Sequence, residues 1–258
     1  MNVYADLNSV IPDRQAQVWA CLKSVTDPEL DESVVELNFV TNADVDADNH
    51  VHIGFRLPTY WCAANFSFLM ADDMRQAVTT LDWVKGVTVV LGEHMYADKI
   101  NAGLSQGLSF EDTFGAEADG NLDELRQTFL VKAFQRRQVA LLNYLTAAGH
   151  EVGKLIALTL SDLECLPLDT EGQKLVQRYM ERRHVVGPIR PDALAFITSE
   201  GAALKSDTYA SYVSGLRRIG VNAEFNGALC RGLLAVRFDL DTPYVPTPEK
   251  HVTSQTAV

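Results

Sequence analysis

The sequence predicts an α+β protein: a small N-terminal α/β domain followed by a mostly helical C-terminal domain. Alternating and β-branched residues mark strands within residues 34–91, and apolar residues at helical spacing dominate after residue 121. The chain has 258 residues, of which 47% are hydrophobic, so it can bury a sizeable core in one or two domains.

The N-terminal part is expected to contain helix, strand, strand, helix and strand, with the three strands forming one sheet. The first helix begins near Pro12 and Asp13 and ends at the turn Thr26–Glu29, because a residue that precedes proline disfavours the helical conformation. The first two strands are expected to form a hairpin. The other predicted ranges are strands at 34–40 and 51–57, a helix at 62–81 and a strand at 87–91.

The domain boundaries follow from changes in composition. Residues 1–92 form the first predicted domain, and the Gly-, Ser- and acid-rich residues 93–120 form a connecting segment. Asn121 is a good cap for a long helix that ends at Gly149, within a helical domain at 121–240. Three prolines predict a disordered tail at 241–258. Shorter helices are expected at 155–160, 172–183, 208–219 and 227–236.

Charge and cysteine usage exclude several classes of function. Residues 1–120 carry 19 acidic and 6 basic side chains, a balance of −13, whereas residues 121–258 have a balance of +1. An acidic half repels phosphate backbones, so we expect no nucleic-acid partner, although it could attract a cation or a basic protein. Simple solubility is the alternative explanation. No apolar run reaches the roughly 18 residues of a membrane span, and four scattered cysteines without a leader predict a cytoplasmic protein with free thiols.

One cysteine lies where a predicted strand passes into a predicted helix. In Leu57-Pro58-Thr59-Tyr60-Trp61-Cys62, a thiol in the first helical turn is favoured as thiolate by the helix dipole and the unpaired N–H groups. Thiolate is the form that binds metal or attacks an electrophile. The alternative is that Cys62 only fills space in the core, as many cysteines do.

An acidic turn and a second cysteine complete the candidate groups. Asp27 and Glu29 flank a proline and could ligate a hard cation or receive an arginine from a partner protein, or form an ordinary turn. Cys230 lies beside Arg231, which favours its thiolate, and Cys62 with Cys230 could form a two-thiol metal site if the domains fold together.

The remaining candidates have a structural explanation. Cys21 and Cys165 are expected to fill cores, and His52 and His94 to be solvated or loop histidines. A solvated face is expected for the arginines of the helical domain, namely Arg182, Arg183, Arg190, Arg217 and Arg218.

Residues 12–92 resemble the PaaD/SufT-like metal–sulfur cluster assembly family. The resemblance rests on Val25-Thr26-Asp27-Pro28-Glu29-Leu30, the hairpin, Thr59 to Cys62, and Gly86-Val87, in that order. It implies a small α/β fold whose members assist insertion of iron–sulfur clusters into client proteins. It also implies that Cys62 is the functional thiol, with Asp27, Glu29 and Thr59 around it.

Two features depart from that family pattern. Bulky Tyr60 and Trp61 precede Cys62, and Ala63 follows it, where the family commonly has small residues and then Cys-Pro. Two aromatic side chains narrow a pocket and could supply a partner-docking surface, or they only cover the helix end. The added C-terminal part, through residues 93–114 and 122–138, is similar to extended relatives found with binuclear-iron monooxygenases.

These observations predict a cytoplasmic, non-catalytic maturation factor that helps place iron or an iron–sulfur cluster in a client metalloprotein. In this hypothesis Cys62 and Cys230 hold the metal transiently, Asp27, Glu29 and Thr59 surround the thiol, and Tyr60 and Trp61 contact the client. The client implied by the softer resemblance is a binuclear-iron monooxygenase. The alternatives are a scaffold that binds an oxygenase component without metal, and a thiol enzyme. For the enzyme, residues 58–66 contain no histidine to act as base.

Overall fold

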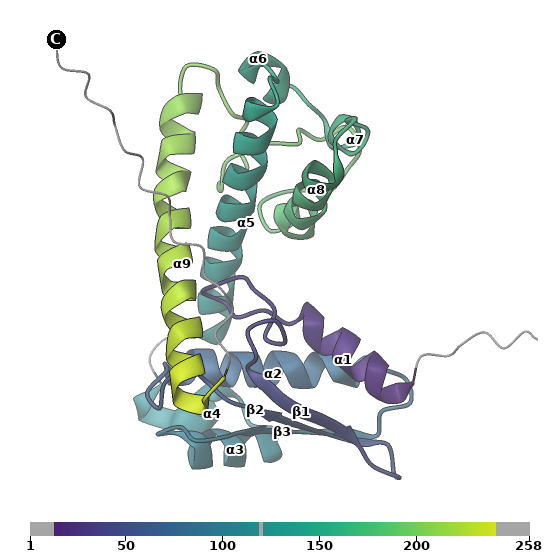
Figure 1. The fold of residues 1–258 in the computed structure, drawn as a ribbon, viewed down its shortest axis with the longest axis vertical. Coiled ribbons are helices and arrows are strands. Elements are labelled where there is room, and N and C mark those ends of the chain that lie inside the picture. The colour runs from purple at the N-terminus through teal and green to yellow at the C-terminus, as the bar shows by residue number, and fades with distance from the viewer. Residues whose placement is uncertain (1–12, 119–120, 241–258) are drawn as a thin grey trace, which may run out of the picture.

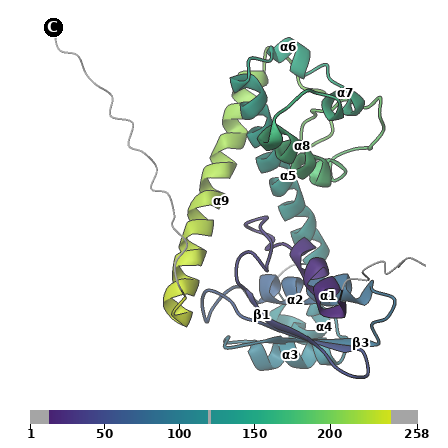
Figure 2. The same ribbon diagram turned by 45° about the vertical axis from the view of Figure 1, so that its right-hand side comes forward.

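Two hydrophobic cores, joined by two long helices, make up the protein (Figures 1 and 2). The computed structural model describes residues 13–118 and 121–240, apart from the side chains of residues 221–223. The disordered tail expected at 241–258 lies outside the described residues. The predicted α+β class, with an N-terminal sheet and a mostly helical remainder, is confirmed.

The N-terminal part has the predicted order of elements. These are α1 (Arg14–Ser24), β1 (Val40–Val45), β2 (His50–Phe55), α2 (Ala64–Thr79) and β3 (Gly86–Leu91). The sheet order is β1-β2-β3, with β1 antiparallel to β2 and β2 parallel to β3. The parallel pair is connected through α2, so the chain segments that leave β2 and β3 begin at the same edge of the sheet.

The sheet lies between helices. Helices α1 and α2 cover one face, and α3 (Ala97–Ser105) lies on the other (Figures 1 and 2). Alternation in β2 directs Val51, Ile53 and Phe55 into the core, where each is at most 2% exposed. Phe55 pairs with Leu91 at the end of the parallel ladder, so the segments that follow these two residues begin side by side.

The structure corrects two predicted boundaries. The first strand is Val40–Val45, and the residues expected to form it at 34–40 instead make turns in which Val34 and Leu37 are buried. An apolar run without strict alternation does not distinguish a buried strand from a buried turn. Helix α2 begins at Ala64 with Ala63 as its cap, so Cys62 precedes the helix and does not lie in its first turn.

Residues 93–118, from the segment expected to connect the two domains, contribute to the first core. They contain α3, α4 (Phe110–Phe114) and a short 3₁₀ turn, η1 (Gly115–Glu117). Ser109 caps α4 by accepting a hydrogen bond from the Asp112 amide. The core side chains of this segment are Ile100, Leu104, Phe110 and Phe114.

The C-terminal part is helical, as predicted. Its elements are α5 (Leu122–Ala147), α6 (Val152–Leu155), α7 (Leu160–Glu164), α8 (Thr170–Arg183) and α9 (Tyr209–Phe238). The predicted cap is confirmed, because the side chain of Asn121 accepts hydrogen bonds from the first turn of α5. Gly149 follows this helix with φ of 90°, a conformation that glycine adopts without strain.

The two helices expected at 208–219 and 227–236 are one continuous helix, α9. Its glycines lower helix propensity, but packing along the helix overrides that preference. Tyr209, Val213 and Leu216 lie in the second core, whereas Leu234 lies in the first. Helix α9 therefore joins both halves of the molecule. Within residues 13–118 and 121–240, no helix is long and apolar enough to span a bilayer.

Candidate functional site

The loop that carries Cys62 connects β2 to α2; we call residues 57–62 the thiol loop. The Cys62 sulfur lies 3.1 Å from the Thr59 hydroxyl oxygen, which is hydrogen-bond distance for a sulfur atom. Cys62 is half-buried against the first core. Its neighbours Tyr60 and Trp61 are 51% and 71% exposed.

A buried histidine from the segment that follows β3 binds the thiol loop. His94 Nε2–H donates to the Cys62 carbonyl oxygen at 2.8 Å, and its Nδ1 accepts from the Tyr96 amide at 3.2 Å. This pattern requires the neutral imidazole with its proton on Nε2. Burial lowers the pKa of His94, and nearby Arg237 lowers it further, so both effects favour the neutral form.

His94 lies in a loop, as one of the two expectations for it allowed, but it is only 5% exposed and so is not solvated. The sequence reasoning did not recognise the parallel pairing of β2 with β3. That pairing brings residues that follow β3 next to residues that follow β2. Recognising it was the way to predict that His94 lies beside the thiol loop.

The end of α9 fixes the thiol loop at its beginning. Arg237 Nη1 donates to the Leu57 carbonyl oxygen at 3.1 Å, and Nη2 donates to the Glu93 carbonyl oxygen at 2.7 Å. One guanidinium thus connects the segments that follow β2 and β3. The C-terminal helix is in this way part of the site.

The second candidate thiol, Cys230, lies on α9 in the same electrostatic neighbourhood as the first. Burial, together with the nearby Asp27, Cys62 and Glu29, raises its pKa to about 11. Arg231 lowers this pKa, but its effect is the smaller one, and its guanidinium pairs with Glu32 at 2.7 Å. Arg231 favours the thiolate of Cys230, as expected, but burial and the acidic neighbours outweigh its effect.

Asp27 belongs to the acidic turn, residues 27–32, which follows α1. Its side chain is 9% exposed, and Oδ1 accepts hydrogen bonds from the amides of Glu29 and Leu30 at 2.9 and 2.8 Å. Burial raises the pKa of Asp27 to about 6, against the lowering effect of these two hydrogen bonds. The carboxyl group is consequently partly protonated near neutral pH.

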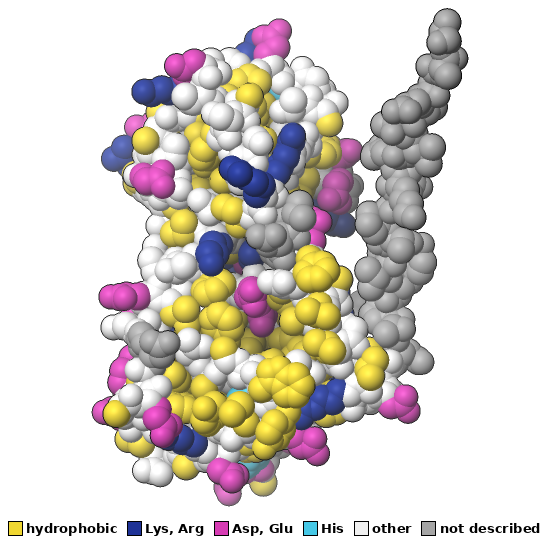
Figure 3. Space-filling model, turned by 90° about the vertical axis from the view of Figure 1, so that its left-hand side faces the viewer, with side chains coloured by type: hydrophobic (Ala, Val, Ile, Leu, Met, Phe, Trp, Pro, Cys, Tyr) yellow, Lys and Arg dark blue, Asp and Glu magenta, His cyan; other side chains and the backbone are white. Residues whose placement is uncertain are grey.

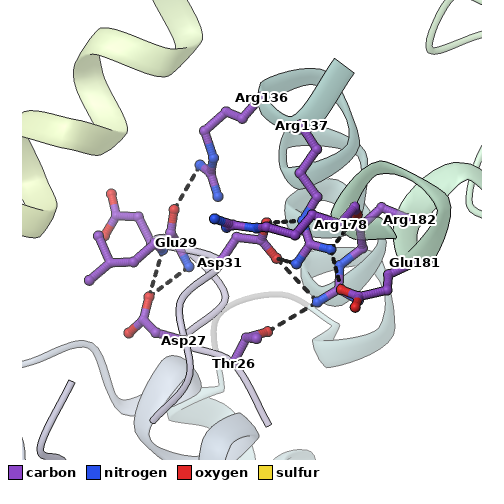
Figure 4. A network of polar contacts seen from close by, with 10 residues as sticks. Thr26, Asp27, Glu29, Asp31, Arg136, Arg137, Arg178, Glu181 and Arg182 are labelled. Carbon is purple, nitrogen blue, oxygen red and sulfur yellow. Dashed lines mark hydrogen bonds and ion pairs between the residues drawn. The ribbon is translucent and has the colours of Figure 1, made fainter. Parts of the chain in front are cut away.

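The most heavily bonded residue of the acidic turn is Asp31, which the sequence reasoning missed (Figure 4). Arg137 of α5 binds it with two hydrogen bonds, Nε to Oδ2 at 2.6 Å and Nη2 to Oδ1 at 2.9 Å. Arg182 of α8 adds a third at 3.1 Å. Asp31 has φ of 54°, an unfavourable left-handed backbone that this buried ion pair holds in place.

Other side chains of the helical domain also bind the acidic turn. Asn226 donates to Glu29 Oε1 at 2.9 Å, and Arg136 donates to the Glu29 carbonyl oxygen at 2.8 Å. The turn therefore receives arginines, as one prediction allowed, but these arginines belong to the same chain. Beside the network lies an open cleft of about 1210 Å³, between the turn and helices α5, α8 and α9.

Three further expectations change with the structure. Arg182 is engaged by Asp31, and Arg183 is 1% exposed and donates to the carbonyl oxygens of Ala195 and Leu194, so neither lies on a solvated face. Cys165 is exposed as the cap that ends α7, so it does not fill a core.

The possible metal ligands of this site are few. Across the residues that the structure describes, no three His, Cys, Asp or Glu side chains converge in a geometry that could hold a metal ion. Cys62 and Cys230 lie near enough to interact electrostatically, as Cys230 and Asp27 also do, while stable iron sites in proteins use more ligands than two thiols. The arrangement suits a metal ion whose remaining ligands come from outside this chain.

The fold and site define a small α/β domain with a half-buried cysteine in the loop between β2 and α2. Residues 15–90 match the family described as iron–sulfur cluster assembly protein. The chain is also 31% identical over 86 residues to a Porphyromonas gingivalis protein (strain ATCC BAA-308 / W83) named Fe-S protein maturation auxiliary factor. That similarity covers 33% of this chain and 79% of the relative.

Through this N-terminal part, the chain belongs to the iron–sulfur cluster assembly protein family. The match ends before α3, so α3 to α9 are additions to the part that defines the family.

Proposed function

We propose that the protein is a cytoplasmic maturation factor that helps to insert iron or an iron–sulfur cluster into a client metalloprotein. The observation that carries the proposal is the half-buried Cys62, whose sulfur lies 3.1 Å from the Thr59 hydroxyl oxygen on a loop fixed by His94 and Arg237. A thiol on a half-buried residue that is held in position suits a ligand that must bind a metal and later release it.

In this proposal the metal or cluster is cargo. Cys62 provides one ligand and Cys230 a second, and the client completes the coordination. The raised pKa of Cys230 supports a transient role, because its thiol must lose a proton to bind iron and readily regains it on release. Asp27, partly protonated near neutral pH and close to Cys230, is suited to accept that proton.

The client contact in this proposal begins at Tyr60 and Trp61, which are exposed directly beside Cys62. Large exposed aromatic side chains are typical of interface hot spots. We propose a binuclear-iron monooxygenase component as the client, on the similarity of residues 93–114 and 122–138 to extended relatives that accompany such enzymes.

The thiol-enzyme alternative lacks a base at the sulfur. Both ring nitrogens of His94 are used by backbone groups, and the Cys62 sulfur lies at hydrogen-bond distance from a hydroxyl group, which is a poor base. The scaffold alternative differs from our proposal only in whether the protein binds iron, which can be measured.

The test is an anaerobic iron titration of the full chain, followed by thiolate-to-iron absorption. We expect Cys62→Ala to lose the absorption band and Cys230→Ala to lose part of it. Cys165→Ala is the matched control, because Cys165 is an exposed thiol on α7 in the other half of the molecule, and it should bind iron as the wild type does.

Equal iron uptake by wild type and Cys62→Ala removes the proposed role of this thiol. If neither protein takes up iron and both support activation of the client equally, the scaffold reading replaces ours.

A further inference from the structure

Helix α9 presents a stripe of apolar side chains to solvent in its second half. Phe225, Leu229, Leu233 and Val236 are 68%, 50%, 40% and 84% exposed. At 3.6 residues per turn these four positions fall within roughly 80° of the helix circumference and extend over about 16 Å of its length. We call them the α9 stripe. Scattered exposed apolar residues are ordinary, but an aligned row of four marks an interaction surface.

The α9 stripe continues toward the thiol loop. Arg237, the residue after Val236, contacts Leu57 and Glu93, so the lower end of the stripe lies at the site. Tyr60, Trp61 and Met95 add exposed apolar area there, Met95 being 48% exposed. Figure 3 faces the side of the molecule on which α9 lies and shows hydrophobic side chains gathered over its lower half.

The charges at the ends of the stripe decide which occupant fits. Glu224 and Asp239, at its two ends, are exposed and acidic. The basic residues of the same segment, Arg231 and Arg237, are used by Glu32 and by backbone carbonyls near Cys62. If the stripes of two copies of this chain packed together with α9 antiparallel, Glu224 of one copy would lie close to Asp239 of the other. If the two helices were parallel, each acidic residue would lie close to the same residue of the other copy. Like charges therefore disfavour a homodimer.

We propose that the α9 stripe docks an amphipathic helix of a partner protein whose apolar ridge is flanked by lysine or arginine, and guides it to the thiol loop. This inference rests on the proposed function, since it names the chemistry of the client element. Four side chains spaced by three or four residues on a straight helix match the ridge of another helix. The net charge of −12 adds long-range attraction for a basic partner.

The probe is an acetylated peptide of about 18 residues with leucine at i, i+3, i+4 and i+7 and lysine elsewhere. Its binding to the full chain is measured by fluorescence anisotropy without iron. We expect Leu229→Glu to weaken binding about tenfold or more, although the added negative charge alone would strengthen it. Ile189→Glu is the matched control, because Ile189 is 49% exposed in the helical domain, and it should bind as the wild type does.

Equal peptide binding by Leu229→Glu and Ile189→Glu overturns the inference. So does a wild-type dimer in sedimentation that Leu229→Glu dissociates, because a second copy would then occupy the stripe. Cys62→Ala should bind the peptide normally. The two tests are therefore independent. A wild type that binds the peptide but takes up no iron contradicts the proposed function alone, and one that takes up iron but does not bind the peptide contradicts this inference alone.

Discussion

Asp27 and Asp31 lie four positions apart in one turn and experience opposite surroundings. Asp31 is held by two arginines, whereas Asp27 is buried and accepts hydrogen bonds from two backbone amides. Burial favours the neutral acid, and it is the main cause of the raised pKa of Asp27. The turn therefore holds one carboxylate for structure and one acid that titrates near neutral pH.

Asp27→Asn is expected to stabilise the protein at neutral pH. The folded state binds the Asp27 proton more tightly than the unfolded state, because the pKa rises from 3.8 to about 6. The stabilising effect of that proton is complete below about pH 4 and is lost as the pH rises through 6. At pH 7 the variant should gain on the order of 1 to 3 kcal/mol in the free energy of unfolding, measured in urea.

The gain should disappear near pH 4, where Asp27 is protonated in both states. Asp48→Asn, at an exposed aspartate, serves as the control and should change the stability little at either pH. An equal gain at pH 4 and pH 7 would contradict a titrating Asp27.

At the scale of single residues, part of the candidate site could be proposed from the sequence. Cys62, Thr59 and the acidic turn could be proposed because their motifs are local. His94 and Asp31 could not, since His94 reaches the thiol loop through the parallel pairing of distant strands, and Asp31 pairs with Arg137 across 106 positions. Contacts of that separation leave no local pattern.

At the scale of elements, the acidic turn binds to α5 and α8 through a buried ion pair. The side chains of Arg137 and Asp31 are 7% and 4% exposed, and Arg137 also pairs with Glu181 at 2.6 Å. A buried charge that loses its partner is far more costly than an exposed one.

Arg137→Ala should lower the free energy of unfolding by about 3 to 5 kcal/mol, because it leaves Asp31 buried with only the weaker contact to Arg182. Arg190→Ala removes an arginine from an exposed pair with Asp192 and should cost at most about 1 kcal/mol. Urea unfolding of both variants makes the comparison, and similar losses would show that the Arg137 pair adds nothing beyond a surface pair.

The elements themselves were largely predictable, with errors of a particular kind. Caps and strand alternation are local, so Asn121 and β2 appeared at the expected places. The shift of the first strand to Val40–Val45 and the merging of two helices into α9 depend on burial supplied by distant segments. Propensity carries no information on that burial.

For the whole molecule, α9 joins two cores that lie far apart in the sequence. All three tryptophans, Trp19, Trp61 and Trp83, lie in the N-terminal half, whereas most helical residues lie in the other half. Tryptophan fluorescence therefore follows the first core, and circular dichroism at helical wavelengths mainly follows the second.

We expect the two signals to give the same urea midpoint in the wild type, because α9 and the Asp31–Arg137 pair couple the cores. In Arg137→Ala the midpoints should separate, with fluorescence and circular dichroism reporting different transitions. Separate midpoints already in the wild type would show that the halves unfold independently.

Arg237 follows Cys62 by 175 positions, and this separation has a consequence for biosynthesis. The ribosome makes the cysteine loop long before it makes the arginine that clamps it. During synthesis the loop therefore lacks this clamp until α9 has left the ribosome and packed against the first core.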